Sequence, residues 1–156
     1  MRESCCPPPE TNTRRACPSC REIGTAVEAA TVQAMLVPEA LTRLDHDSFQ
    51  FCAAPSCAVV YYSATGATFS TADLHVPVWQ KSAPGARMVC YCFGENEADI
   101  RREIEDTGRT AAIERVRGHI ADHRCACTVR NPRGVCCLRD LIAATRDVSI
   151  RARARA

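Results

Sequence analysis

The sequence predicts an α+β protein in which a small β-rich N-terminal unit is followed by a compact helical unit. Two patterns and the break between them lead to this prediction. Residues 49–79 contain short runs of strand-favouring residues, punctuated by turn-forming proline and glycine. Residues 88–147 look helical throughout, because their apolar residues recur three or four positions apart. The segment QKSAPGAR, residues 80–87, contains a Pro-Gly step and separates the two patterns as a linker.

We expect four segments along the chain. Residues 1–15 include three consecutive prolines and few apolar side chains, which favours a flexible arm. Residues 16–80 are expected to form the β-rich unit, and residues 86–148 the helical unit. Residues 149–156 end in RARARA and are expected to be a basic, solvated tail.

Three helices are expected in the second unit. Asn96 is a suitable N-cap for the first, and Gly108 is placed to end it as a C-terminal glycine does. Thr110 can cap the second helix, whose apolar residues again share one face. The third helix follows the Asn-Pro-Arg-Gly turn at residues 131–134 and includes Leu138.

Twelve cysteines in 156 residues are far more than an ordinary soluble domain carries. Such a density serves either a disulfide framework in an oxidising compartment or thiolate metal sites in a reducing one. The N-terminus lacks the apolar run of a secretory signal, and no stretch approaches the roughly 18 apolar residues of a membrane span. We therefore expect a cytoplasmic, metal-binding protein without a membrane span. A secreted, disulfide-rich module is the weaker alternative.

Charge and motif content argue against several other functions. A formal net charge of +2 and few aromatic residues give no footprint for nucleic acid, so no nucleic-acid partner is expected. The sequence has neither the Gly-x-Ser-x-Gly elbow of hydrolases nor a glycine-rich phosphate loop, and it offers no catalytic residues. The histidines are isolated in sequence. Only His123, two residues before Cys125, is a candidate metal ligand.

Two cysteine pairs in the first unit have the spacing of a zinc site. Cys17-Pro-Ser-Cys20 is a knuckle in which a tight turn aims two sulfurs at one ion, and Cys52 and Cys57 can supply the other two. Four thiolates leave no open position for water, so such a zinc would be structural. The alternatives are a redox-active pair, which would need a strand-helix context that is absent here, or cysteines without metal.

The cysteines of the second unit point to a different centre. Cys90 and Cys92 form a C-x-C pair ahead of a helix, which suits thiolates that enter an iron-sulfur cluster. A 2Fe-2S cluster needs two more sulfurs, and two later cysteine pairs can supply them. Burial as small hydrophobic residues would explain one or two of these positions, but not six in pairs. The later pairs are Cys125 with Cys127 and Cys136 with Cys137.

A family resemblance covers most of the chain, roughly residues 16–148. The motifs CPSC, FCAAPSCAVVYY, VCYCFGENEADI, DTGRTAAI and NPRGVCCL occur together in one order. In that order and spacing the chain resembles the N-terminal iron-sulfur and zinc domain of CopZ-type copper chaperones. The second half of that domain is related to the bacterioferritin-associated ferredoxin.

The resemblance implies two metal centres and selects among the later cysteines. It implies a mononuclear zinc held by the first two cysteine pairs and a 2Fe-2S cluster in the helical unit. It favours Cys127 over Cys125 and Cys137 over Cys136, because the family's ligands stand at these places around the Asn-Pro-x-Gly turn. The implied zinc ligands are Cys17, Cys20, Cys52 and Cys57, and the implied cluster ligands are Cys90, Cys92, Cys127 and Cys137.

The remaining cysteines keep several roles open. Cys125 and Cys136 could be packing residues, replacement ligands or a soft-metal site of their own. Cys5 and Cys6 on the arm suit Cu(I) or Hg(II), or are unused. In the full-length chaperones this domain precedes a copper-binding domain with an M-x-C-x-x-C loop. This sequence has no such loop, so we do not expect copper delivery by that route.

The expected function is that of an iron-sulfur and zinc metalloprotein in one-electron transfer or in the handling of copper or another soft metal. The alternative is a redox or metal sensor, or a scaffold, whose cluster state is read by a partner protein. We expect no enzymatic activity beyond metal-ion reduction through the cluster. The expected partner is a redox or metal-transfer protein, such as a copper-transporting ATPase or another metal-resistance component. Four arginines either stabilise the reduced cluster or form a solvated face: Arg124, Arg130, Arg133 and Arg139.

Overall fold

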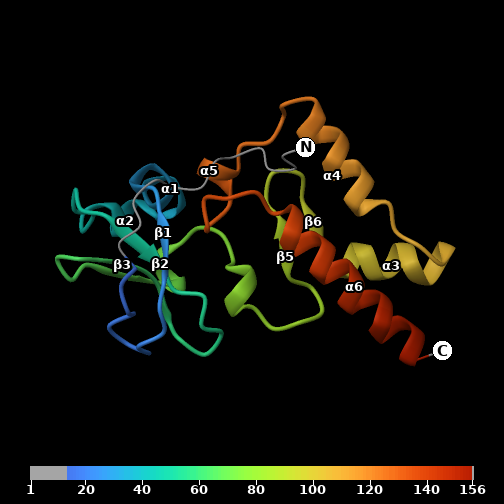
Figure 1. Cartoon of the computed structure of the whole chain (residues 1–156), viewed down its shortest axis with the longest axis horizontal. Coiled ribbons are helices and arrows are strands. Elements are labelled where there is room, and N and C mark those ends of the chain that lie inside the picture. The colour runs from blue at the N-terminus through green and yellow to red at the C-terminus, as the bar shows by residue number, and fades with distance from the viewer. Residues whose placement is uncertain (1–13, 156) are drawn as a thin grey trace.

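A four-stranded antiparallel sheet forms the N-terminal part of the protein in the computed structural model, which describes residues 14–155 (Figure 1). Each strand pairs with the next one along the chain, so the sheet is a meander. Two short helices connect its first and second strands. The elements are β1 (Thr25–Val27), α1 (Ala29–Met35), α2 (Pro38–Leu41), β2 (Phe49–Phe51), β3 (Val59–Ser63) and β4 (Thr68–Ser70).

Aromatic residues fill the core of this unit. Phe49 and Phe51 of β2 are each 1% exposed, and their rings lie 6.1 Å from those of Phe69 and Tyr61 respectively. Val32 of α1 packs into the same cluster. Tilted aromatic pairs at this distance add to the free energy of apolar burial, so the sheet has a well-packed core despite its short strands.

The second unit begins with a β-hairpin and continues as four helices. The prediction that residues 88–147 are helical throughout is therefore wrong at its start. The sequence Met-Val-Cys favours a strand, and Gly94, with φ of 75°, closes the turn after it. The elements are β5 (Met88–Cys90), β6 (Glu95–Asn96), α3 (Glu97–Thr107), α4 (Ala112–Ala121), α5 (Cys127–Arg130) and α6 (Leu138–Ala154).

The predicted start and end of the first helix are confirmed. The Asn96 side chain accepts a hydrogen bond of 3.0 Å from the backbone N–H of Asp99, as an N-cap does. Gly108 ends α3 in the left-handed conformation, with φ of 78°. The predicted cap of the second helix is wrong by one residue: the N-cap of α4 is Ala111, and the Thr110 hydroxyl, one residue earlier, accepts a 3.2 Å hydrogen bond from the backbone N–H of Ala112.

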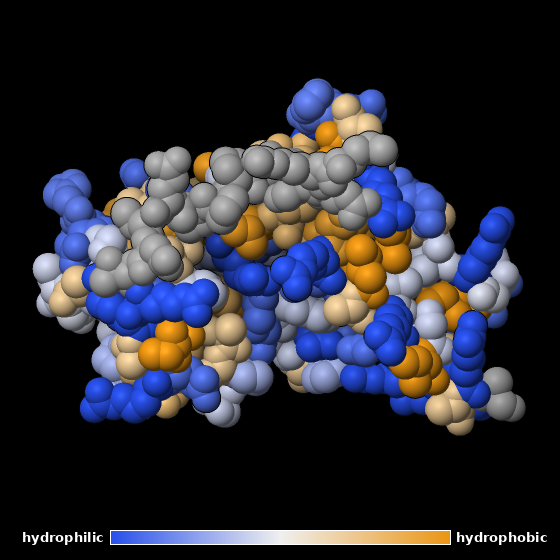
Figure 2. Space-filling model, in the orientation of Figure 1, coloured by the Kyte–Doolittle hydropathy of each residue, from blue (hydrophilic) through white to orange (hydrophobic). Residues whose placement is uncertain are grey.

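Helix α6 is the long packing element of the second unit, and it contacts α3, α4 and β5 (Figure 1). Its buried face includes Leu141 and Ala144, which pack with Ile100 of α3 and Val116 of α4. Figure 2 shows hydrophobic residues gathered at the surface where α6 passes α4. Because α6 continues through Ala154, residues 149–154 of the predicted tail are helical.

Three buried contacts, which we call the junction, fix the loop of residues 127–134 to the sheet unit. The hydroxyl of Thr31 on α1 donates a 2.6 Å hydrogen bond to the carbonyl of Thr128. The hydroxyl of Tyr61 on β3 donates another, also 2.6 Å, to the carbonyl of Pro132. At Gly134 a Cβ atom would lie 2.7 Å from the Thr31 hydroxyl, so only glycine allows this close approach. The two units therefore pack as neighbours through specific contacts.

The predicted flexible arm, with Cys5 and Cys6, lies outside the described residues except for Arg14 and Arg15. The Arg15 guanidinium donates a 2.8 Å hydrogen bond to the carbonyl of Ser48. Within residues 14–155, no helix combines the length and the apolar character that crossing a bilayer would require.

Candidate metal centres

Four cysteine sulfurs of the sheet unit converge on one point. Every sulfur lies within 4.8 Å of the other three, with 3.9 Å between Cys17 and Cys57 and 3.6 Å between Cys20 and Cys52. Tetrahedral zinc with bonds of about 2.3 Å places its sulfurs about 3.8 Å apart. The group therefore has the donor type, number and spacing that a closed zinc site needs.

Two local turns present these sulfurs. In the first turn, Cys17 donates its backbone N–H to Glu22 and accepts from Arg21, whose φ of 68° reverses the chain. The second turn runs from Cys52, directly after β2, to Cys57, just before β3. Because β2 and β3 are paired, they hold both ends of the second turn. The sheet thus fixes half of the donor set before any ion binds.

Burial and hydrogen bonding set the charge state of this site. Burial raises the pKa of Cys52 to about 12. Burial also acts on Cys57, but hydrogen bonding, first from the backbone N–H of Val59, outweighs it and lowers the pKa of Cys57 to about 7. The ammonium of Lys81 donates 2.8 Å hydrogen bonds to the carbonyls of Ala54 and Cys57. This ammonium places a positive charge beside the site. Four thiolates would carry more negative charge than a divalent ion neutralises, so the positive charge would be favourable there.

A second cysteine group lies between the hairpin and the later helices. Cys90 ends β5, Cys92 lies in the turn that follows, Cys127 begins α5, and Cys137 is the N-cap residue of α6. The sulfurs of Cys92 and Cys127 are 3.6 Å apart, and the thiols of Cys90 and Cys137 interact with each other. The structure thus brings together the four cysteines that the resemblance implied.

This second group is organised in pairs, unlike the first. Within residues 14–155, only the first group has at least three metal-binding atoms all within 4.8 Å of one another. In the second group, Cys127 interacts with both Cys92 and Cys137, and Cys137 interacts in turn with Cys90. Such a spread of sulfurs fits a binuclear cluster, in which each iron takes two cysteines, better than a single ion.

The thiolate character of the second group is concentrated on two residues. The hydrogen bond with Cys127 is the main reason that the pKa of Cys92 falls to about 7, and the backbone N–H of Ala126, 3.3 Å from the sulfur, acts in the same direction. Interaction with Cys127 also lowers the pKa of Cys137 to about 4. The partner thiols carry the protons: interaction with Cys137 raises the pKa of Cys90, and interactions first with Cys136 and then with Cys137 and Cys92 raise that of Cys127. Thiolates are the ligands that iron-sulfur clusters require.

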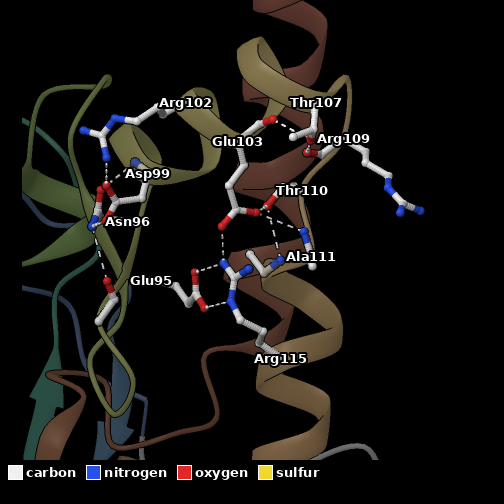
Figure 3. Close-up of polar contacts among 12 residues, drawn as sticks. Glu95, Asn96, Asp99, Arg102, Glu103, Thr107, Arg109, Thr110, Ala111 and Arg115 are labelled. Carbon is white, nitrogen blue, oxygen red and sulfur yellow. Dashed lines mark hydrogen bonds and ion pairs between the residues drawn. The ribbon is translucent and has the colours of Figure 1, made fainter.

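Arg115 of α4, which sequence reasoning missed, positions the hairpin that carries Cys92. Its guanidinium makes two bonds to the carboxylate of Glu95 in β6, at 2.8 and 2.9 Å, and a third of 2.7 Å to Glu103 of α3 (Figure 3). The hydrogen bond from Arg115 is the largest reason that the pKa of Glu103 falls to about 2. A planar guanidinium bound to two carboxylates holds three elements in fixed relation.

Cys125 and Cys136, the two described cysteines without an assigned role, also lie near this group. Cys136 is partly buried and interacts with the thiol of Cys127. Cys125 is partly buried two residues before Cys127. His123 is exposed after α4, with φ of 54°. His119, on which sequence reasoning placed no weight, stacks on the ring of Phe93 at 4.0 Å, next to Cys92.

The four predicted arginines have different surroundings. Arg130 donates a 3.5 Å hydrogen bond to the carbonyl of Cys92, and Arg124 lies 3.1 Å from Nδ1 of His119. Arg133 instead forms a 3.0 Å ion pair with Asp140. Arg139 is exposed. Only the first two therefore extend a positive charge over the surface beside Cys92.

Comparison with known proteins agrees with this geometry. Residues 14–75 match the CopZ family model that is described as a zinc binding domain. This segment contains all four cysteines of the first group, so the chain carries a zinc-binding domain with a four-cysteine site.

Two comparisons, both with CopZ of Archaeoglobus fulgidus, extend the likeness beyond that segment. The copper chaperone CopZ of Archaeoglobus fulgidus is 34% identical over 121 residues, which are 78% of this chain and 57% of that protein. This chain thus spans less than two thirds of that relative. The X-ray structure of the Archaeoglobus fulgidus CopZ N-terminal domain matches with a TM-score of 0.68 and 30% identity, covering 82% of this chain and 95% of that one. The mixed α+β fold of the two units is therefore shared with a solved structure.

Proposed function

The chain belongs to the family of CopZ N-terminal domains, and from that premise we propose that it binds one zinc ion and one 2Fe-2S cluster and acts in copper handling by one-electron transfer. The convergence of four cysteines from β5, α5 and the start of α6 carries the proposal. Burial as small hydrophobic residues would account for one or two of these cysteines, but not for four thiols that meet at one place.

In this proposal the zinc ligands are Cys17, Cys20, Cys52 and Cys57. Four sulfurs within 4.8 Å of one another would complete the tetrahedron of a zinc ion and leave no free position for a substrate. Its role is structural: it joins the N-terminal turn to the edge of the sheet, where a unit of this size buries little apolar surface.

The proposed cluster ligands are Cys90, Cys92, Cys127 and Cys137. A 2Fe-2S cluster bound there would supply the uptake and release of one electron. The protein's own part is to hold the sulfurs and to favour the reduced form. The N–H of Ala126 donates to the Cys92 sulfur, and Arg130 adds a positive charge nearby, so both raise the reduction potential.

Cu(II) is the proposed acceptor of the electron. One electron from the cluster converts Cu(II) to Cu(I), and a redox partner protein restores that electron. The Cu(I) then passes to a metal-transfer partner, such as a copper-transporting ATPase or another metal-resistance component. This chemistry needs reduced thiols, so we place it in the cytoplasm.

Metal content and Cu(II) reduction test the proposal. Anaerobically purified protein is expected to contain about two Fe per Zn and to show a reversible one-electron EPR signal of a 2Fe-2S cluster. On addition of Cu(II), the reduced protein should form Cu(I), detected with a Cu(I)-specific chelator. A variant with Cys90 and Cys92 replaced by alanine controls for reduction by thiols alone. Protein without iron would refute the cluster, and equal Cu(I) yields from both proteins would refute the reductase role.

A further inference from the structure

We infer that electrons enter and leave the second centre at Cys92, and that the basic surface around this residue docks an acidic face of a redox partner protein. We call this surface, formed by Phe93, His119, Arg124 and Arg130, the Cys92 face. The inference rests on the proposed cluster, and it goes further by naming the point of electron entry and the chemistry of the partner.

Burial distinguishes Cys92 from the other proposed ligands. Cys90 is fully buried, and Cys127 and Cys137 are 1% and 2% exposed, whereas Cys92 is only partly buried. Electron transfer between proteins requires close approach of the two centres. Within the described residues, Cys92 is therefore the ligand at which a partner comes nearest to the cluster.

Aromatic and basic side chains surround this ligand. The next residue, Phe93, stacks with His119 of α4 at 4.0 Å, and Arg124 binds Nδ1 of that histidine. From the other side, Arg130 of α5 reaches the carbonyl of Cys92. The neighbouring Val129 is 46% exposed. An apolar centre with a charged rim is a common composition for a protein-protein interface.

The charges of the Cys92 face are not neutralised internally. Within residues 14–155, neither Arg124 nor Arg130 has an ion pair, whereas Arg115 and Arg133 do. The three carboxylates that follow Cys92 most closely in sequence are already engaged: Glu95 binds Arg115, Glu97 binds Arg87, and Asp99 binds Arg102. Asp122, which is exposed before Arg124, is the one acidic residue between α4 and α5. An excess of positive charge at an exposed redox ligand selects an acidic partner and accelerates its approach.

Small oxidants of opposite charge test this electrostatic preference. The cluster of the full chain is first reduced and its oxidation then followed by stopped flow. One electron passes to hexacyanoferrate(III), an anion, or to hexaammineruthenium(III), a cation. At about 10 mM ionic strength charges act over about 30 Å, so added salt should slow the reaction with the anion and should not slow the reaction with the cation.

A charge-matched pair of variants localises the effect. Arg124→Gln with Arg130→Gln should slow oxidation by the anionic reagent about tenfold at low salt, since each charge acts on a trivalent ion over several ångströms. The control is Arg151→Gln with Arg153→Gln, at the exposed C-terminal end of α6. It removes the same amount of charge away from the Cys92 face and should leave the rate nearly unchanged. An acidic flavodoxin hydroquinone, which gives one electron and becomes the semiquinone, should show the same ranking as an electron donor.

Three outcomes would overturn the inference. Equal slowing by both double variants would show that net charge acts rather than the Cys92 face. Unchanged rates for Arg124→Gln with Arg130→Gln would show that electrons pass elsewhere. A reaction of the unmodified protein with the anion that added salt accelerates would reverse the predicted sign. In each case the cluster spectrum is intact and the proposed function stands, whereas a chain that binds no iron would refute both.

Discussion

The first cysteine group takes its sulfurs from two turns of one small sheet unit, whereas the second takes them from a hairpin, a short helix and the start of a long helix. The first set is enclosed and reinforced locally by β2, β3 and Lys81. The second depends on the junction, because Thr31 and Tyr61 of the sheet unit hold the loop that carries Cys127. For the two proposed centres we therefore expect a one-sided dependence: zinc should bind without the cluster, but the cluster should need the sheet unit.

Loss of the zinc site should have the largest effect. Cys52→Ala removes one of four proposed ligands, and a structural zinc contributes on the order of 10 kcal/mol to the folding of small zinc domains. Because the sheet unit would then lose its order, the junction should fail and iron should be lost as well. Elemental analysis should find little Zn and little Fe. A variant that lost Zn but kept two Fe per chain would show that the units are independent.

Loss of a cluster ligand should remove the cluster but leave the zinc content unchanged. Cys137→Ala is expected to abolish the cluster spectrum while the protein keeps one Zn per chain. Cys136→Ala is the matched control, since it removes the adjacent thiol, and it should retain the cluster with a small spectral change because that thiol interacts with Cys127. If the two variants gave the reverse result, Cys136 would be the ligand.

Crowding of the junction should weaken the cluster without affecting zinc. Gly134→Ala places a methyl group 2.7 Å from the Thr31 hydroxyl, at a φ of 68° that also disfavours a side chain. We expect a loss of about 2–4 kcal/mol, faster release of iron and an unchanged zinc content. Gly108→Ala is the control, because it has a similar φ of 78° but no atom within 4 Å of the new methyl group. It should cost only about 1–2 kcal/mol. Equal iron release from both would exclude crowding as the cause.

The sequence-based predictions were right where a feature depends on local contacts and missed features that depend on residues far apart in the sequence. Asn96 and Gly108 were correctly predicted as helix boundaries because capping depends on residues within one turn. Helix α1 was not predicted, because its seven residues have no side-chain cap. The Tyr61 contact joins residues 71 positions apart, so no local pattern could reveal it. The selection of Cys127 and Cys137 came from the family resemblance, and spacing alone would have left Cys125 and Cys136 equally suitable.

Removal of one junction hydrogen bond should also accelerate iron release, but less than Gly134→Ala does. Tyr61→Phe leaves the buried carbonyl of Pro132 without its donor, which costs about 1–3 kcal/mol. Iron release under a chelator should accelerate several-fold. Tyr62→Phe removes a neighbouring hydroxyl that binds Arg15 at 2.5 Å within the sheet unit. It should lower the melting temperature without accelerating iron release. A similar rate of iron loss in both variants would mean that overall stability, not the junction, controls the cluster.

The smallest expected effect is the pH dependence of the Arg115 network. The pKa of Glu103 is lowered to about 2 from 4.5, so its ion pair stabilises the fold above pH 4.5 and is lost as the pH falls toward 2. Glu103→Gln should therefore lower stability by about 1 kcal/mol at pH 7, since the pair is partly solvated. The difference in melting temperature between the two proteins should shrink between pH 5 and pH 3. Acid removes thiolate-bound metal from both alike, so this difference isolates the carboxylate. A constant difference over this range would show that the Glu103 carboxylate contributes only through shape and not through charge.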